Sequence, residues 1–160
     1  MRARTADDGV EIREADRADL LDVLRIERTS FPQPWPYAAF ESFLDEAGFL
    51  VAVDGGSVVG YVVADVTPNF GRDIGHVKDL AVEPDARGQG LGRTLLEHGL
   101  AELAVAGATV VKLEVRESND PARSLYRNVG FEPLRRITRY YEDGEDALVM
   151  VLDVSEWRGS

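Results

Sequence analysis

The feature that most constrains the fold is a glycine-rich run, EPDARGQGLGRTLLEHGL, at residues 83–100. Glycines stand at the alternate positions Gly88, Gly90 and Gly92, directly before a leucine-rich segment. Glycine in the first turn of a helix costs roughly 0.8–1.0 kcal/mol relative to alanine. A glycine-rich turn between a strand and a helix presents backbone N–H groups at the positive end of the helix dipole, which suits a phosphate. The run therefore predicts a strand–loop–helix unit with an anion-binding turn.

The spacing of the glycines excludes two common nucleotide-binding motifs. A P-loop needs lysine after its last glycine, and this run contains no lysine. A G-x-G-x-x-G dinucleotide motif that begins at Gly88 needs glycine where Arg93 stands. The pattern that remains is R-x-x-G-x-G, filled by Arg87, Gly90 and Gly92.

Hydrophobic periodicity predicts the element order β-α-α-β-β-β-α-β-α-β-β, which is typical of an α/β domain with a mixed sheet covered by helices. Helices are expected over LLDVLRIERT with Asp16 as N-cap, over YAAFESFLDEA to near Gly48, over 90–105, and over ARSLYRNV. Strands are expected over VEIREA, FLVAVD, SVVGYVVADV, HVKDLAV, TVVKLEV, FEPLRRITRYY and ALVMVLDV. In HVKDLAV we expect Val77, Leu80 and Val82 to be buried. One domain over residues 1–160 is expected, with short flexible ends at 1–8 and 155–160.

The net charge and composition of the chain exclude several classes of binding partner and site. The net charge of −11 opposes binding to a phosphate backbone, so no nucleic-acid partner is expected. No apolar stretch approaches the roughly 20 residues that span a bilayer, and the N-terminus lacks an apolar signal-peptide core. We therefore expect a cytoplasmic protein without a membrane partner. The absence of cysteine excludes disulfides and a thiol nucleophile, and the two histidines show no metal-ligand spacing, so no metal is expected.

Four stretches together resemble the GNAT-type N-acetyltransferases, and within them the ribosomal-protein-alanine N-acetyltransferases and archaeal Nα-acetyltransferases. LAVEPDARGQGLGRTLLEH, LEVRESNDPARSLYRNVGF and RYYEDGEDALVM occur in this order, and IERTSFPQPWPYAAF is similar to the family's substrate-side loop. The similarity runs from about Val10 to Val154. It implies the GNAT fold, with a mixed, mostly antiparallel sheet of about seven strands covered by about four helices. It also implies acetyl-CoA as acyl donor and a protein or peptide N-terminus as acceptor.

The resemblance implies a cofactor site around the glycine run. The strand end at Leu80 to Val82 matches the family's edge that pairs with the pantetheine arm, and an extended amide chain can add to an exposed sheet edge. Asn119 matches an asparagine near the cofactor, although it fits a helix N-cap equally well and one side chain could serve both roles. The implied cofactor-binding residues are Leu80, Ala81, Val82, Arg87, Gly88, Gln89, Gly90, Leu91, Gly92, Arg93, Asn119 and Tyr126.

The resemblance also implies the acid and the base. Glu114 matches the general base, Tyr126 matches the general acid, and His76 is a second candidate base. An α-amino group, with a reference pKa of roughly 7.7–8.0 against about 10.4 for lysine, costs roughly 3 kcal/mol less to deprotonate than lysine. A carboxylate can take that proton directly or through water, and a tyrosine can give one to the leaving thiolate. Without the resemblance, Glu114 reads as a strand-end carboxylate, Tyr126 as a core aromatic and His76 as a solvated strand residue.

Aromatic residues would bind the acceptor. Tyr140 and Tyr141 match paired tyrosines of the last hairpin, and Phe31, Pro32 and Trp35 would form the opposite wall. Gln33 departs from the glutamate of some archaeal and eukaryotic relatives, so no role of that glutamate is carried over. A ribosomal protein with a small first residue is the nearest family substrate, and a monomer or weak dimer is expected. Two alternatives stay open, namely a GNAT that acetylates a small-molecule amine and a non-catalytic acyl-CoA-binding module.

Overall fold

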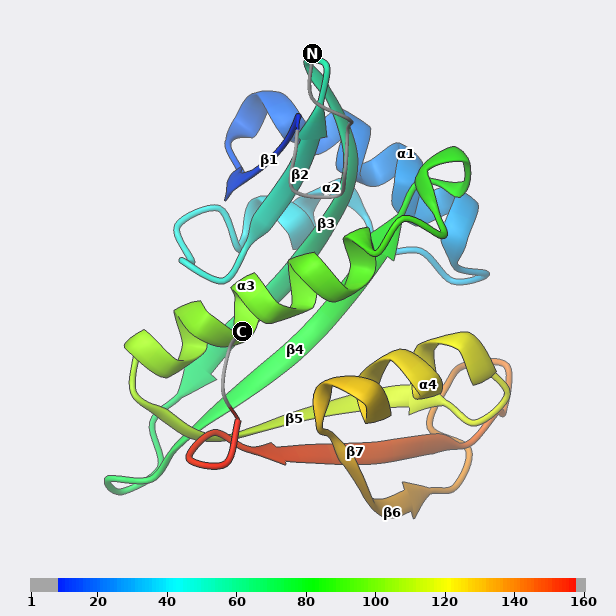
Figure 1. Cartoon of the computed structure of the whole chain (residues 1–160). Coiled ribbons are helices and arrows are strands. Elements are labelled where there is room, and N and C mark those ends of the chain that lie inside the picture. The colour runs from blue at the N-terminus through cyan, green and yellow to red at the C-terminus, as the bar shows by residue number, and fades with distance from the viewer. Residues whose placement is uncertain (1–8, 158–160) are drawn as a thin grey trace.

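The computed structural model describes residues 9–157. Their elements follow one another in the expected order (Figure 1). The strands are β1 (Val10–Glu14), β2 (Leu50–Asp54), β3 (Ser57–Thr67), β4 (Asp73–Val82), β5 (Ala108–Arg116), β6 (Glu132–Ile137) and β7 (Ala147–Asp153). The α-helices are α1 (Leu20–Ser30), α2 (Tyr37–Glu41), α3 (Leu91–Val105) and α4 (Asp120–Val129). Flexible ends are predicted at 1–8 and 155–160, and residues 1–8 and 158–160 lie outside the described residues. Residues 154–156 form a turn, after which Trp157 N donates to Val154 O at 3.2 Å.

The strands form one mixed sheet in the order β1-β2-β3-β4-β5-β7-β6. Every neighbouring pair is antiparallel except β4 and β5, which are parallel. The predicted seven-stranded, mostly antiparallel sheet with four helices is therefore confirmed. In the part of the chain that is described, no helix is long and apolar enough to cross a bilayer.

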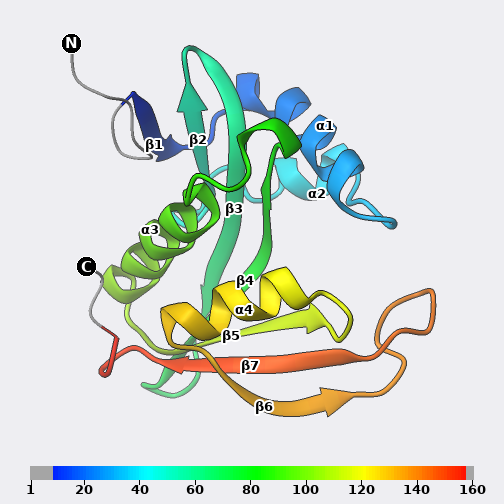
Figure 2. The same ribbon diagram turned by 45° about the vertical axis from the view of Figure 1, so that its right-hand side comes forward.

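β4 and β5 stay together over only a short length. Their pairing runs from Asp73 beside Ala108 to His76 beside Lys112, after which β4 continues along β3 and β5 continues along β7. Figure 2 shows the β2–β4 half and the β5–β7 half of the sheet turning away from each other. The two strand ends therefore leave backbone edges that face an opening in the sheet.

A β-bulge in β4 lies at Lys78, because Val77 and Asp79 pair with successive residues of β3. A bulge bends a strand and re-aims its side chains. It explains why Val77 and Leu80, three positions apart, both pack in the core beneath α3. The prediction that Leu80 and Val82 are buried is wrong in degree, because both are only half-buried and line a cavity at the opening.

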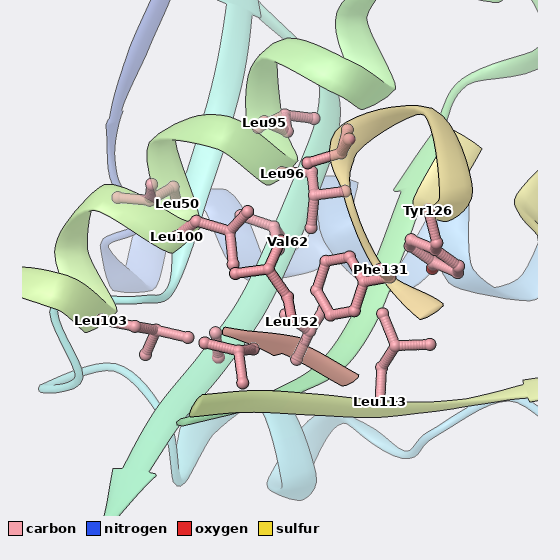
Figure 3. Close-up of a cluster of buried hydrophobic side chains, with 14 of the residues drawn as sticks. Leu50, Val62, Leu95, Leu96, Leu100, Leu103, Leu113, Tyr126, Phe131 and Leu152 are labelled. Atoms are coloured by element: carbon pink, nitrogen blue, oxygen red, sulfur yellow. The ribbon is translucent and has the colours of Figure 1, made fainter. Parts of the chain in front are cut away.

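Each face of the sheet buries a hydrophobic core. The five predicted leucines of α3 are all buried, and α3 packs against β2, β3, β4 and β5. Figure 3 shows Leu95, Leu96, Leu100 and Leu103 in this core, and burying a leucine stabilises the fold by about 1.5–3 kcal/mol. On β3, Val62 and Ala64 belong to this core, whereas Tyr61 and Val63 face the core under α1 and α2. The α1 face is closed by Leu20, Val23, Leu24, Ile26, Phe40, Phe49 and Val51.

Local signals set most element ends as predicted. Asp16 caps a 3-10 turn that runs into α1, and Asn119 caps α4 by accepting from Ala122 N at 3.2 Å. Gly90, with φ of 81°, begins α3, and Gly130 ends α4.

Two predicted elements end early. α2 stops at Glu41 rather than near residue 48, because Phe43 N and Glu46 N bond to the third residue back and the chain turns so that Phe43 stacks on Trp35 at 5.8 Å. β6 stops at Ile137, because Arg139 takes a positive φ of 51° and its N–H donates to the Asp146 carboxylate at 2.9 Å. The paired tyrosines at 140–141 therefore lie in a loop and not in a strand.

Gly75 allows α3 to lie against the sheet where β4 and β5 still pair. A Cβ at this position would come within 2.9 Å of Leu103 Cδ1 and 3.0 Å of Val111 Cγ2. We expect Gly75→Ala to lower the free energy of unfolding by about 1–3 kcal/mol in urea titrations, since the packed core must shift. The control is Gly99→Ala in α3, whose Cβ would meet Val62 at an ordinary 3.5 Å and which should unfold at or above the parental midpoint. Equal destabilisation of both variants would contradict this interpretation.

Candidate active site

The opening between β4 and β5 holds two adjoining cavities of about 550 Å³ each. The first cavity lies against the α1–α2 loop and the β6–β7 loop, and the second lies against the glycine run. The residues that line both cavities are Phe31, Leu80, Asn119, Ala122 and Tyr126. The two cavities therefore form one cleft with two compartments.

The glycine run forms the wall of the second compartment. Gly88 and Gly90 both have φ of 81°, a left-handed conformation that strains any residue with a side chain. The N-cap residue of α3 is Gly90, which has no side chain to cap the helix, and Gly92 and Arg93 in the first turn line the compartment. The first amides of a helix lack intrahelical partners, so this wall offers free N–H groups at the positive end of a dipole. The wall fits a diphosphate.

Not every residue predicted for the cofactor lies at this wall. Arg87 lines the compartment, but its side chain turns back so that Nε donates to Val82 O at 2.9 Å and Nη2 to Ser30 Oγ at 3.3 Å. Gln89 is exposed and does not line the compartment. The glycine amides are therefore better placed than these two side chains to meet an anion.

The end of β4 offers an extended edge to the same compartment. Leu80, Ala81 and Val82 pair with β3 on one side and line the cavity on the other. Since β5 has left β4 by this point, a ligand with amide groups could take the place of the missing strand. The edge and the glycine wall together suit an extended ligand that carries amide groups and a diphosphate.

His76 and Glu114 meet where the strands part. His76 Nε2 lies 2.7 Å from Glu114 Oε1, and the side chains are only 20% and 13% exposed. The hydrogen bond from His76 lowers the pKa of Glu114 against the opposing effect of burial, with further help from the charges of Lys112 and Lys78. Glu114 is therefore an ionised, partly buried carboxylate, which is the state a proton acceptor needs.

Tyr126 lies between the two compartments. It comes from α4 and is buried, and its ring packs edge-on against Phe131 with centroids 5.9 Å apart. Burial raises the pKa of Tyr126 well above its usual value, and the nearby Asp79 charge raises it further. The phenol therefore keeps its proton at neutral pH and can act as a donor.

Aromatic residues form the walls of the first compartment. Phe31 and Trp35 line one side, and Tyr140 and Tyr141 line the other with their rings edge-on at 5.0 Å. Pro32, predicted with them, is exposed and does not line the cavity. The structure therefore brings together four of the five predicted wall residues.

Arg116, at the end of β5, joins these two walls. Its Nη1 donates to Asp143 and Glu145 of the β6–β7 loop at 2.8 and 3.0 Å, and its guanidinium lies 4.1 Å from the ring centre of Tyr141. Its Nη2 donates to Gln33 of the α1–α2 loop at 3.3 Å. Burial raises the pKa of Tyr141 to about 12, although the Arg116 charge opposes the change. The sequence did not single out Arg116.

A buried polar cluster beside the first compartment was also missed. The Glu27 carboxylate accepts from Tyr61 OH at 2.5 Å and from Trp35 N at 2.8 Å, and Tyr61 OH also lies 3.4 Å from Asp79. Burial, with Glu27 close by, raises the pKa of Asp79 well above its usual range. Glu27 thus ties the Trp35 wall to β3.

A sequence signal for this cluster existed. Glu27 stands four residues after Val23 and seven after Leu20, so it falls on the apolar stripe of α1. A carboxylate on such a stripe must find hydrogen-bond donors inside the protein. Lys78 also had a signal, because Lys78 and Lys112 are the only two lysines of the chain and both lie beside the His76–Glu114 pair.

The chain is similar in sequence to a known family and to members of that family. The acetyltransferase (GNAT) family matches residues 20–131. The chain is 37% identical over 150 residues to an N-alpha-acetyltransferase of Sulfurisphaera tokodaii, covering 87% of this chain and 90% of that protein. It is 34% identical over 148 residues to the ribosomal protein bS18-alanine N-acetyltransferase of Escherichia coli K12, covering 90% and 97%.

One solved structure carries the same arrangement of elements. Ard1 from Thermoplasma volcanium superposes with a TM-score of 0.84 at 29% identity, covering 91% of this chain and 97% of that one. Among residues 9–157, no three or more His, Asp or Glu side chains are grouped so that they could hold a metal ion.

Proposed function

The chain belongs to the acetyltransferase (GNAT) family and is an acyltransferase, and on this premise we propose that it acetylates the N-terminal amine of proteins with acetyl-CoA. The observation that carries the proposal is the two-compartment cleft. One compartment fits CoA, and the other has aromatic walls open to a peptide and contains a carboxylate–histidine pair. A protonated tyrosine lines both compartments.

Each part of the cleft has a separate task. The amides from Gly88 to Arg93 would hold the diphosphate, and the β4 edge at 80–82 would hold the pantetheine amides. Bound acetyl-CoA supplies a thioester that reacts with a neutral amine. Glu114, with His76 behind it, accepts the proton of the incoming ammonium, and Tyr126 provides the proton that the departing sulfur needs. The substrate amine acts as nucleophile, so no covalent bond to the protein is required.

The walls favour a peptide N-terminus over a small amine. Four aromatic side chains and the Arg116 contacts build a wall on each side of the amine site, which offers a bound peptide more surface than a polyamine could use. A relative acts on ribosomal protein bS18 alanine, as its name states, and we extend to this chain a preference for small first residues. Asn119, which caps α4 and lines both compartments, would serve as cap and cofactor contact together.

An acceptor screen tests the function. We expect peptides that begin with alanine or serine to show a kcat/KM roughly 100-fold above that of the same peptide blocked at its N-terminus and carrying one free lysine, because the lysine amine holds its proton about 2.5 pH units more strongly. Free amino acids and polyamines are the matched small acceptors. Faster turnover of these would support a small-molecule acetyltransferase instead. Thermal protection by acetyl-CoA with no turnover of any amine would support a binding module.

A further inference from the structure

Lys78 lies between two acceptors on the face that carries His76. Its Nζ is 3.4 Å from His76 Nδ1 and 3.9 Å from Asp65 Oδ1. Asp65 on β3 stands directly across from His76 on β4, and the bulge leaves Lys78 without a partner on β3. The ammonium also rests over the ring of Phe43, 5.9 Å from its centre. A small movement of Nζ therefore changes whether it donates to His76 Nδ1 or to Asp65 Oδ1.

The contacts of His76 define where its hydrogens are. An ammonium group can only donate, so Nδ1 facing Lys78 is the unprotonated nitrogen, and the ring hydrogen is on Nε2 facing Glu114. A second proton on the ring must go to Nδ1. Lys78 and a protonated Nδ1 would then both be donors facing each other, so Lys78 would have to turn away.

Asp65 provides the place to which Lys78 can turn. Its Oδ1 is buried and accepts no hydrogen bond from any residue between 9 and 157. A buried acceptor without a donor is unfavourable, and a shift of Lys78 Nζ towards it would remove that cost. The two acceptors are thus complementary, because one loses the ammonium when the other gains it.

We propose that Lys78 and Asp65 form a movable counter-ion pair that sets how readily the His76–Glu114 pair takes up a proton. The Lys78 ammonium donates to His76 Nδ1 while the His76 ring is neutral, and it moves to the Asp65 carboxylate when the ring is charged. Both are positioning residues, and the proposal rests on the base role given to His76 and Glu114 above. The charged and titratable groups around His76 are Asp65 on β3, Lys78 on β4, Lys112 and Glu114 on β5, and Tyr140 and Tyr141 in the β6–β7 loop.

Histidine ring-proton NMR titration tests the pair without relying on activity. The chain has two histidines, so His98→Gln assigns the spectrum and exposed His98 serves as internal reference. In Lys78→Met we expect the titration midpoint of His76 to rise by roughly 1 pH unit, because a neighbouring positive charge is lost. In Asp65→Asn we expect it to fall by roughly 0.5 pH unit or more, because a negative charge is lost and Lys78 stays at Nδ1.

Further variants distinguish the movable counter-ion pair from a purely structural role of Lys78 and Asp65. Lys78→Arg keeps the charge and should keep the parental midpoint, and Lys112→Met, on the far side of Glu114, should move it less than Lys78→Met does. Asp65→Asn should shift the midpoint less in the Lys78→Met background than in the parent, because the two act together. Shifts in the same direction for both single variants, or equal Asp65→Asn shifts in both backgrounds, would overturn the proposal.

The pH profile of the reaction distinguishes this inference from the proposed function. The acidic limb of kcat/KM should follow the NMR midpoints, moving to higher pH in Lys78→Met and to lower pH in Asp65→Asn. Midpoints that move as stated with an unmoved acidic limb would uphold the counter-ion pair and remove His76 and Glu114 from the base role.

Discussion

Glu114→Gln is expected to lower kcat by about 10²–10⁴-fold, the usual contribution of a positioned general base. Glutamine has the size of glutamate, and its amide oxygen can still accept from His76 Nε2, which lies 2.7 Å from Glu114 Oε1 in the parent. It cannot take a proton. Acetyl-CoA affinity should stay within about twofold of the parent, because Glu114 lines the first compartment and not the second. Steady-state kinetics with an alanine-starting peptide and calorimetry with CoA measure the two quantities.

The matched control is Glu117→Gln, three residues along the chain. Glu117 pairs with Arg136 at 2.6 Å and lines neither compartment, so its loss should leave kcat at the parental value. His76→Gln decides between the two candidate bases. If Glu114→Gln turns over at the parental rate and His76→Gln does not, the base is the histidine.

Glu114→Gln also has a predicted stability signature. His76 lowers the pKa of Glu114 in the folded protein, so its ionised form stabilises the fold at pH values above the unfolded pKa. That contribution is lost as the pH falls through the folded pKa. The variant should therefore be less stable than the parent at neutral pH and should lose less stability on acidification.

The sequence predicts the elements well where a local signal decides them. The leucines of α3 repeat with helical period, Gly90 begins the helix, and the Gly55–Gly56 turn joins β2 to β3. These features depend on residues within a few positions of one another, so periodicity and turn chemistry suffice. The mixed, mostly antiparallel sheet and the GNAT fold followed from the resemblance over nearly the whole chain.

The details of the site depend on contacts between distant residues, and periodicity does not encode them. Nothing near Lys78 marks a bulge, which exists because β4 must bend away from β5 while it stays paired with β3. Arg116 meets Gln33, 83 positions away, and Glu27 meets Tyr61, 34 positions away. The roles of the site residues stay predictions that the variants described here test.

Tyr126→Phe is expected to lower kcat by about 10²–10⁴-fold, because the departing thiolate then lacks its positioned proton donor. The ring can keep its edge-on contact with Phe131, so the free energy of unfolding should change by no more than about 1.5 kcal/mol. Since burial raises the pKa of Tyr126 well above its usual value, the parental enzyme should show no loss of kcat up to about pH 10 through this group. Rate measurements across this pH range, with urea unfolding of both proteins, check both expectations.

Tyr140→Phe is the control that separates proton donation from the loss of a hydroxyl in the cleft. Tyr140 is 48% exposed and lines the first compartment but not the second, so its variant should raise the KM for peptide and spare kcat. A Tyr126→Phe variant with parental kcat would mean that solvent protonates the sulfur. Tyr126 would then be a core aromatic that closes the boundary between the two compartments, and the catalytic role would remain with the His76–Glu114 pair alone.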